Sequence, residues 1–151
     1  MNIVFNEETG LLVPGEHKLT IEEFEKIFVY NDKRQQIYNG FRKLMTVFRE
    51  IGCSHLYADG SFVTKKPYPG DIDVCWHMHD DIGPKIAQLT KLKAICSPIF
   101  ELDRKFIKDE FCADVFPANQ MEGGSGIMFK DFFQKDKHTN ESKGIVIIEL
   151  L

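Results

Sequence analysis

The sequence has no long hydrophobic run. A membrane-spanning helix needs about 18 or more consecutive apolar residues, and the run Gly144–Ile148 near the end of the chain is far shorter. The first ten residues include acidic side chains where a signal peptide would carry Lys or Arg ahead of an apolar stretch. We therefore expect a cytoplasmic protein that does not associate with a membrane.

The chain also lacks an excess of positive charge. It has 19 Lys and Arg residues against 23 Asp and Glu residues, which gives a net charge of −4. Proteins that coat nucleic acid are usually basic, so this balance disfavours non-specific DNA or RNA binding. This net charge still allows a local basic patch that binds a nucleotide or the end of a tRNA.

Cysteine is scarce, and its spacing excludes the usual zinc knuckle. The four residues Cys53, Cys75, Cys96 and Cys112 form no Cys-x-x-Cys pair. In a cytoplasmic protein, isolated cysteines are most often reduced and buried. We expect four buried thiols with no direct role in function.

The composition is that of a globular protein. Of the 151 residues, 43% are hydrophobic, which is close to the average for folded domains. The length predicts a single domain, 1–151. Gly10, Pro14 and Gly15 predict that residues 1–18 form an irregular N-terminal arm.

Two helices are indicated after this arm. Thr20 and Glu23 have the spacing of a capping box, and a short helix is expected to follow. Asp32 is expected to cap a second, longer helix, which ends before Gly52, a favoured residue just after a helix. The apolar stripe of this second helix consists of Ile37, Phe41, Leu44, Met45, Phe48 and Ile51.

Strand patterns then alternate with shorter helices. Strands are predicted over 55–58, 71–76, 111–116 and 145–150, the last with a buried helical end as the alternative. A helix is expected from Pro84 to about Ile95, with Pro98 as its stop. Residues 123–126 are expected to form a glycine-rich loop and 127–134 a short aromatic helix. This order predicts an α/β (α+β) fold, with a small mixed β-sheet flanked by helices.

The most informative motif combines Gly60-Ser61 with Asp71-Ile72-Asp73. The eleven Asp residues predict about 0.8 Asp-x-Asp pairs by chance, and an upstream Gly-Ser lowers that expectation to about one in a hundred. Two acids at alternate positions of a strand point to the same side, where they can share divalent cations. Gly60 allows a phosphate to come close to the backbone, and Ser61 offers a hydroxyl and an N–H group. These residues indicate nucleotidyl transfer assisted by two metal ions.

This pattern resembles the nucleotidyltransferase superfamily of the polymerase-beta type. Members share a Gly-Ser turn, an Asp-x-Asp strand about ten residues later and a third acid on a later strand. The best candidate for the third acid is Asp114, which lies between apolar residues. The matching region covers residues 55–116, and the short chain is similar to minimal single-domain members encoded beside partner toxins, as in toxin–antitoxin pairs.

The resemblance implies a magnesium-dependent enzyme that transfers NMP from an NTP to a hydroxyl group. Asp71, Asp73 and Asp114 would hold two Mg²⁺ ions, with Mn²⁺ as an alternative. Gly60 and Ser61 would hold the β- and γ-phosphates. Many members have an Arg-Gly where this chain has lysines, and Lys65 or Lys66 would then bind the triphosphate as a point charge. The acceptor would be a protein side chain, a tRNA end or a small molecule.

Other interpretations of the same residues are structural. The acids are also compatible with the solvated face of an edge strand. Ser61 could simply cap a turn, and Lys65-Lys66 could belong to an ordinary surface loop. A second class of function is an inactive module of the same fold that neutralises a partner protein through residues 129–133. A third is a zinc-binding regulator that uses His77 and His79. The sequence shows no third ligand for that zinc site, so we favour the interpretation that both histidines simply lie at the exposed end of a strand.

Overall fold

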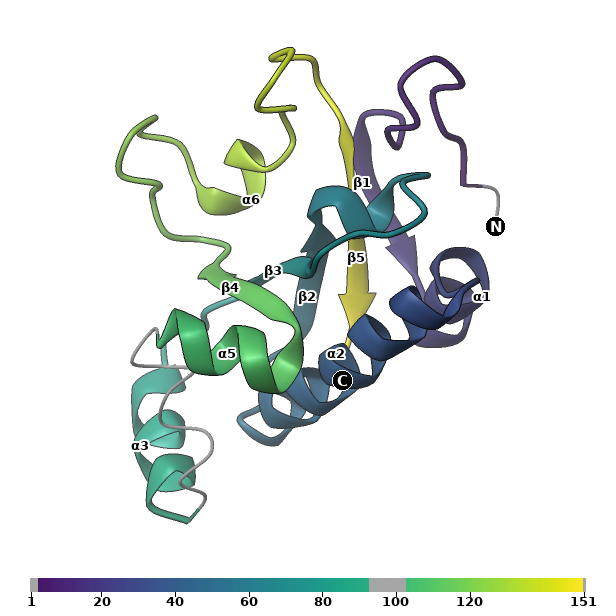
Figure 1. Ribbon diagram of the computed structural model, residues 1–151. Coiled ribbons are helices and arrows are strands. Elements are labelled where there is room, and N and C mark those ends of the chain that lie inside the picture. The colour runs from purple at the N-terminus through teal and green to yellow at the C-terminus, as the bar shows by residue number, and fades with distance from the viewer. Residues whose placement is uncertain (1–2, 93–102, 151) are drawn as a thin grey trace.

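A mixed five-stranded sheet forms the centre of the protein (Figure 1). The computed structural model describes residues 3–92 and 103–150. The strands are β1 (Gly15–Leu19), β2 (His55–Asp59), β3 (Ile72–Trp76), β4 (Ala113–Pro117) and β5 (Gly144–Glu149). The helices are α1 (Ile21–Phe28), α2 (Asp32–Glu50), the short 3₁₀ helix η1 (Gly60–Val63), α3 (Ile82–Leu92), α5 (Arg104–Phe111) and α6 (Phe129–Phe132).

The strand order across the sheet is β1-β5-β2-β3-β4. The outer pairs β1–β5 and β3–β4 are parallel, whereas the inner pairs β2–β5 and β2–β3 are antiparallel. The predicted α+β class with a small mixed sheet is therefore confirmed. The register places Asp59 opposite Asp73, and Asp73 opposite Asp114. Three neighbouring strands thus carry a row of acids on the same face of the sheet.

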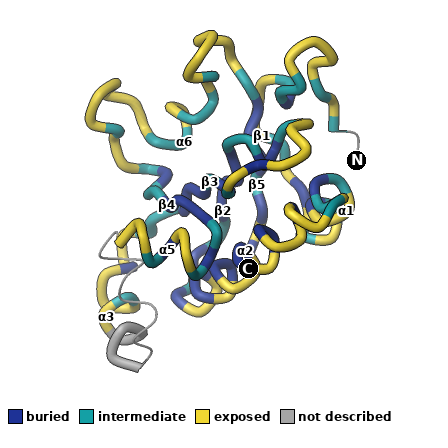
Figure 2. The backbone as a smooth tube through the Cα atoms, viewed as in Figure 1, coloured by how far each residue is buried: buried dark blue, intermediate teal, exposed yellow. Residues whose placement is uncertain are grey.

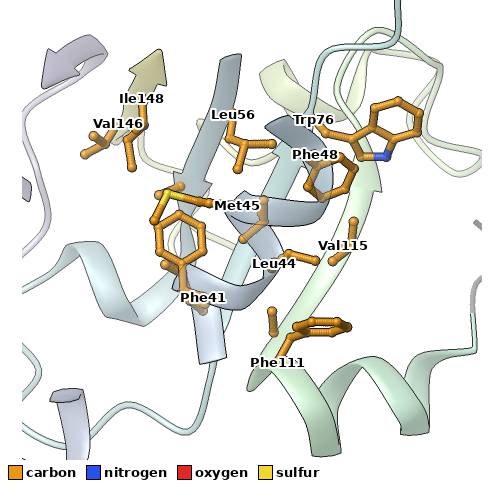
Figure 3. Packing of buried hydrophobic residues seen from close by; sticks show 14 of the residues in the cluster. Phe41, Leu44, Met45, Phe48, Leu56, Trp76, Phe111, Val115, Val146 and Ile148 are labelled. Atoms are coloured by element: carbon orange, nitrogen blue, oxygen red, sulfur yellow. The ribbon is translucent and has the colours of Figure 1, made fainter. Parts of the chain in front are cut away.

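The main hydrophobic core lies between α2 and the other face of the sheet (Figure 3). The indole ring of Trp76 stacks on Phe48 with 5.3 Å between ring centroids. Figure 2 shows buried positions concentrated along the strands, whereas α2 alternates between buried and exposed residues. Residues of this core labelled in Figure 3 are Phe41, Leu44, Met45, Phe48, Leu56, Trp76, Phe111, Val115, Val146 and Ile148.

A smaller apolar cluster covers part of the acidic face. Tyr57 and Cys75 are buried there against half-buried rings from β4 and α6. Phe116 of β4 stacks on Phe129 of α6 with a centroid separation of 5.1 Å. The α6 segment therefore covers the middle of this face.

The first two helices agree closely with their sequence signals. Thr20 and Glu23 form the predicted capping box at α1, and the whole apolar stripe of α2 is buried. The cap of α2 is a correction, because Asn31 accepts from the backbone N–H of Arg34, so that Asp32 is the first helical residue. Gly52 follows α2 with a φ of +82°, as expected of a glycine at that position.

Two predicted boundaries near the ends of the sheet are wrong. Residues 15–18 were expected in the irregular arm, but they belong to β1, which the parallel pairing with β5 stabilises. The strand expected over 111–116 begins only at Ala113. Phe111 is the last residue of α5, and Cys112 ends that helix in the left-handed conformation with a φ of 55°. The sequence pattern did not predict helix α5, which covers Arg104–Phe111.

The remaining helix and cysteine predictions are met in part. Helix α3 begins at Ile82, two residues before the expected Pro84. The expected end near Ile95 and the stop at Pro98 lie outside the described residues, as does Cys96. Cys53 and Cys75 are buried free thiols, as expected, whereas Cys112 is only half-buried. The predicted loop at 123–126 and the final strand are confirmed.

Candidate functional site

Three aspartates meet at one end of the β3–β4 pair. Asp73 lies in β3, Asp71 directly precedes that strand, and Asp114 lies opposite Asp73 in β4. Each offers a carboxylate oxygen, and these oxygens lie within 4.8 Å of one another. Shared oxygen ligands at this spacing suit a hard divalent cation such as Mg²⁺. The structure therefore brings together the three acids selected from the sequence.

Two basic side chains from α5 neutralise part of this negative charge. Lys108 Nζ lies 3.1 Å from Asp71 Oδ2 and 3.6 Å from Asp114 Oδ2. Arg104 Nη2 lies 3.3 Å from Asp114 Oδ2. The hydrogen bond to Asp71 and the charge of Asp114 raise the pKa of Lys108. Both basic side chains are largely exposed, and a metal ion that bound the three acids would have to displace them.

A fourth acid, Asp59, was not selected from the sequence. It lies at the end of β2 and is only 1% exposed. Neither carboxylate oxygen has a hydrogen-bond partner in the described part of the chain. Lys143 Nζ lies 3.7 Å from Oδ1. Burial raises the pKa of Asp59 to about 7, although the charge of Lys143 opposes that shift.

Burial and neighbouring negative charge also disfavour ionisation of Asp73. Burial, followed by the charges of Asp71 and Asp114, raises the pKa of Asp73 to about 6 from 3.8. A carboxyl with a raised pKa stabilises the fold most when it is protonated, and that stability is lost as the pH rises through the folded-state pKa. The metal-free protein should therefore lose stability between about pH 4 and pH 7 because of this group.

Comparison with Asp73→Asn isolates this effect, because asparagine cannot ionise. In EDTA, the free energy of unfolding of the variant should rise relative to wild type by about 3 kcal/mol between pH 4 and pH 7. Urea unfolding at several pH values measures the difference. The exposed Asp80→Asn serves as the control. A flat profile for Asp73→Asn would show that Asp73 ionises freely.

Gly60 begins η1 next to these acids and has a φ of +80°. A Cβ atom at this position would collide with Oδ2 of Asp73. We expected glycine here so that a phosphate could approach the backbone, and the structure adds the carboxylate of Asp73 as a second reason. The adjacent Ser61 accepts hydrogen bonds at its carbonyl oxygen from Thr64, both from Oγ1 and from the backbone N–H.

Gly60→Ala should therefore affect both stability and the position of Asp73. We expect the free energy of unfolding to fall by about 1–3 kcal/mol, because the φ angle and the contact are both unfavourable to a side chain. Gly123→Ala is a matched control, since a Cβ there has no neighbour within 4 Å. Urea unfolding of both variants tests this expectation, and equal stabilities would contradict it.

A cleft of about 1200 Å³ opens beside the acids. Its lining includes Gly60 and Ser61 as well as the carboxylates of Asp71 and Asp73. The lysines in this lining are Lys65, Lys66, Lys135, Lys137 and Lys143. The two predicted lysines therefore reach the same cleft as the Gly-Ser turn. The last three were not predicted, because a loop distant in sequence brings them there.

The loop that carries Lys65 and Lys66 is attached to helix α2 through Arg34. This arginine is 0% exposed. Its Nη1 donates to the carbonyl oxygens of Phe28 and Phe62, at 2.9 and 2.7 Å. Its Nη2 donates to those of Thr64 and Lys66, at 2.9 and 2.6 Å. One buried guanidinium group thus holds three points of this loop, and Asn31 adds a hydrogen bond to the carbonyl oxygen of Pro67 at 2.7 Å.

The fold and the site define an α+β protein with converging carboxylates beside a cleft rich in lysine. The chain belongs to a protein family of unknown function, DUF6932, whose family model matches residues 3–149. Comparisons with curated proteins and with solved structures gave no match. Among the described helices, none has the length and apolar character needed to cross a membrane.

Proposed function

We propose that the protein is a magnesium-dependent nucleotidyltransferase that moves NMP from an NTP to an acceptor hydroxyl. The observation that carries this proposal is the convergence of Asp71, Asp73 and Asp114 within 4.8 Å. It is supported by the Gly60-Ser61 turn and by the lysines of the same cleft. On an ordinary solvated strand face, Asp73 would not be buried beside other acids, because burying an unpaired carboxylate is costly.

The acids have distinct proposed roles. Asp71 and Asp73 would hold two Mg²⁺ ions between them, and Asp114 would share the ion on the acceptor side. Ions bound there supply positive charge to the phosphates and lower the pKa of the attacking hydroxyl. Mn²⁺ is expected to substitute because it also prefers carboxylate oxygens.

The transfer is an in-line substitution at the α-phosphorus atom. A bond forms between the acceptor oxygen and this phosphorus atom, and the bond to the oxygen that bridges to the β-phosphate breaks. Asp114 takes the hydroxyl proton, and pyrophosphate leaves with the electron pair of the broken bond. Gly60 and Ser61 bind the β- and γ-phosphates, and Lys65 and Lys66 add positive charge at the cleft wall.

A labelling experiment tests the proposed activity. The protein is incubated with Mg²⁺ and each of the four NTPs carrying ³²P at the α-phosphate, alone and with total tRNA or a cell extract. The resemblance to minimal nucleotidyltransferases favours a protein or tRNA acceptor over a small molecule. We expect label on one of these acceptors and release of pyrophosphate. No transfer and no binding of any Mg²⁺–NTP would contradict the proposal.

A second candidate function is binding to a partner protein without catalysis. The observation in its favour is the group of partly exposed apolar side chains around α6. Phe129 and Phe133, which the sequence placed in this surface, are instead half-buried against Phe116. The exposed members are Met121, Ile127, Met128 and Phe132. Partner binding that survives loss of the three acids would favour this function.

A further inference from the structure

Three histidines gather at the end of the β2–β3 pair that lies away from the acids. His55 begins β2, and His77 directly follows β3 at the opposing position. Their rings are stacked, with centroids 4.7 Å apart and an angle of 20° between the planes. His79 meets His77 edge to face at 4.8 Å. The third imidazole, which sequence analysis could not identify, therefore comes from the neighbouring strand.

Partly buried hydrogen bonds hold the two chain segments together beside these rings. The thiol of Cys53 donates to the carbonyl oxygens of His55 and His77, at 3.3 and 3.4 Å. The backbone N–H of Ser54 donates to Nε2 of His79 at 3.1 Å. Antiparallel pairing continues through a hydrogen bond from His77 N–H to the carbonyl of His55. The backbone that carries all three rings is thus well fixed.

The charged groups around the histidines favour neutral imidazoles. Burial and the neighbouring rings lower the pKa of His55 and of His77. Lys130 acts in the same direction, whereas Glu149 near His55 and Asp80 near His77 oppose it. No ion pair within residues 3–92 and 103–150 joins these rings to a carboxylate. Neutral imidazole is the form that binds metal ions.

We propose that His55, His77 and His79 form a second metal site, which binds a transition-metal ion such as Zn²⁺. The nitrogens of His77 and Nδ1 of His79 have no hydrogen bond in the described part of the chain, and Nε2 of His55 has only a 3.3 Å contact with Tyr57. The rings of His55 and His77 are nearly parallel, so binding a shared ion would require His55 and His79 to turn and to give up their contacts with Ser54. A water molecule would complete the tetrahedral geometry that Zn²⁺ prefers.

This site is independent of the proposed nucleotidyl transfer. His55 and Asp59 are four positions apart in β2, which corresponds to about 13 Å along a strand. The two ligand sets also differ in chemistry. Carboxylates select Mg²⁺ and Mn²⁺, whereas imidazoles select Zn²⁺, Ni²⁺ and Cu²⁺. Failure of either proposal therefore leaves the other intact.

Zinc titration in the presence of excess Mg²⁺ tests the histidine site. Isothermal titration calorimetry at pH 7.5 with a reducing agent should show one Zn²⁺ bound per chain with a Kd below about 10 μM, equivalent to about −7 kcal/mol. His77→Phe keeps an aromatic ring in the stack but removes both nitrogens, and should weaken binding at least tenfold. His138→Ala is the control, because His138 lies in the cleft and not beside the other rings.

Substitution of Co²⁺ provides a second readout. Tetrahedral Co²⁺ bound to the wild-type protein should give visible absorption that His55→Ala and His79→Ala reduce or abolish. Circular dichroism identifies any variant that fails to fold. Metal binding by the variants that do fold then tests the histidine site. Wild-type zinc affinity in a folded His77→Phe protein, or no zinc binding by wild type, would overturn the proposal. Loss of zinc binding in Asp73→Asn would assign the ion to the acids instead.

Discussion

Asp73→Asn is expected to reduce nucleotidyl transfer by about a thousandfold or more, equivalent to about 4 kcal/mol of transition-state stabilisation. Asp73 neighbours both of the other acids, since Asp71 lies two residues earlier and Asp114 faces Asp73 from β4. Asparagine keeps the shape of the side chain but removes the negative charge that metal ions require. The fold should be retained, because the substitution also removes a buried charge that is costly without metal.

Transfer of ³²P-labelled NMP by wild type and by the variant measures this loss, with Asp80→Asn as the control. Thermal unfolding provides a measure that does not depend on the acceptor. At 100 times its Kd, Mg²⁺–NTP should stabilise the wild type by about 2.7 kcal/mol, and the variant should gain little. In EDTA, the variant should melt at or above the wild-type temperature. Wild-type transfer by Asp73→Asn would exclude the proposed metal-binding role.

Arg34→Met is expected to lower the free energy of unfolding by about 3–5 kcal/mol. The arginine is fully buried and donates to four carbonyl oxygens. It also stacks on Tyr30 and Phe62, with distances of 4.6 and 4.8 Å from its guanidinium carbon to the ring centroids. Methionine fills most of the volume but leaves the carbonyls without these donors, so the loop from Phe62 to Lys66 would be held less tightly to α2.

The stability loss is measured by urea unfolding. Arg42→Met is a matched control, because Arg42 lies on the same helix with an exposed side chain, and it should cost less than about 1 kcal/mol. Arg34→Lys should recover only part of the stability, since a lysine cannot donate in the forked geometry of arginine. Equal stability of Arg34→Met and wild type would mean that water readily replaces the guanidinium at these carbonyls.

The sequence predicted the elements whose signals are local. The stripe of α2 repeats at helical spacing, and the capping box of α1 needs only Thr20 and Glu23. The acid cluster was also predictable in part, because Asp71 and Asp73 lie two residues apart and therefore on one side. Asp114 required a resemblance to a known family, since nothing local indicates which strand would lie beside β3.

Features that depend on distant partners were missed. Strand β1 has little apolar character of its own and forms because β5 pairs with it. The buried Asp59 resembles an ordinary turn residue until Lys143 is placed beside it. His55 is separated from His77 by more than twenty residues, and only the register of β2 and β3 makes them neighbours. Such relations follow from topology, which a single sequence specifies only indirectly.

The position of β5 between β1 and β2 has a consequence for synthesis of the chain on the ribosome. Gly15 pairs with Gly144, so β1 has no strand to pair with until the residues up to β5 have been translated. Until β5 is inserted, β1 and β2 each present an unpaired edge that favours aggregation. Pairing of residues so distant in sequence also slows folding. A nascent chain should therefore expose these strand edges until β5 has left the exit tunnel.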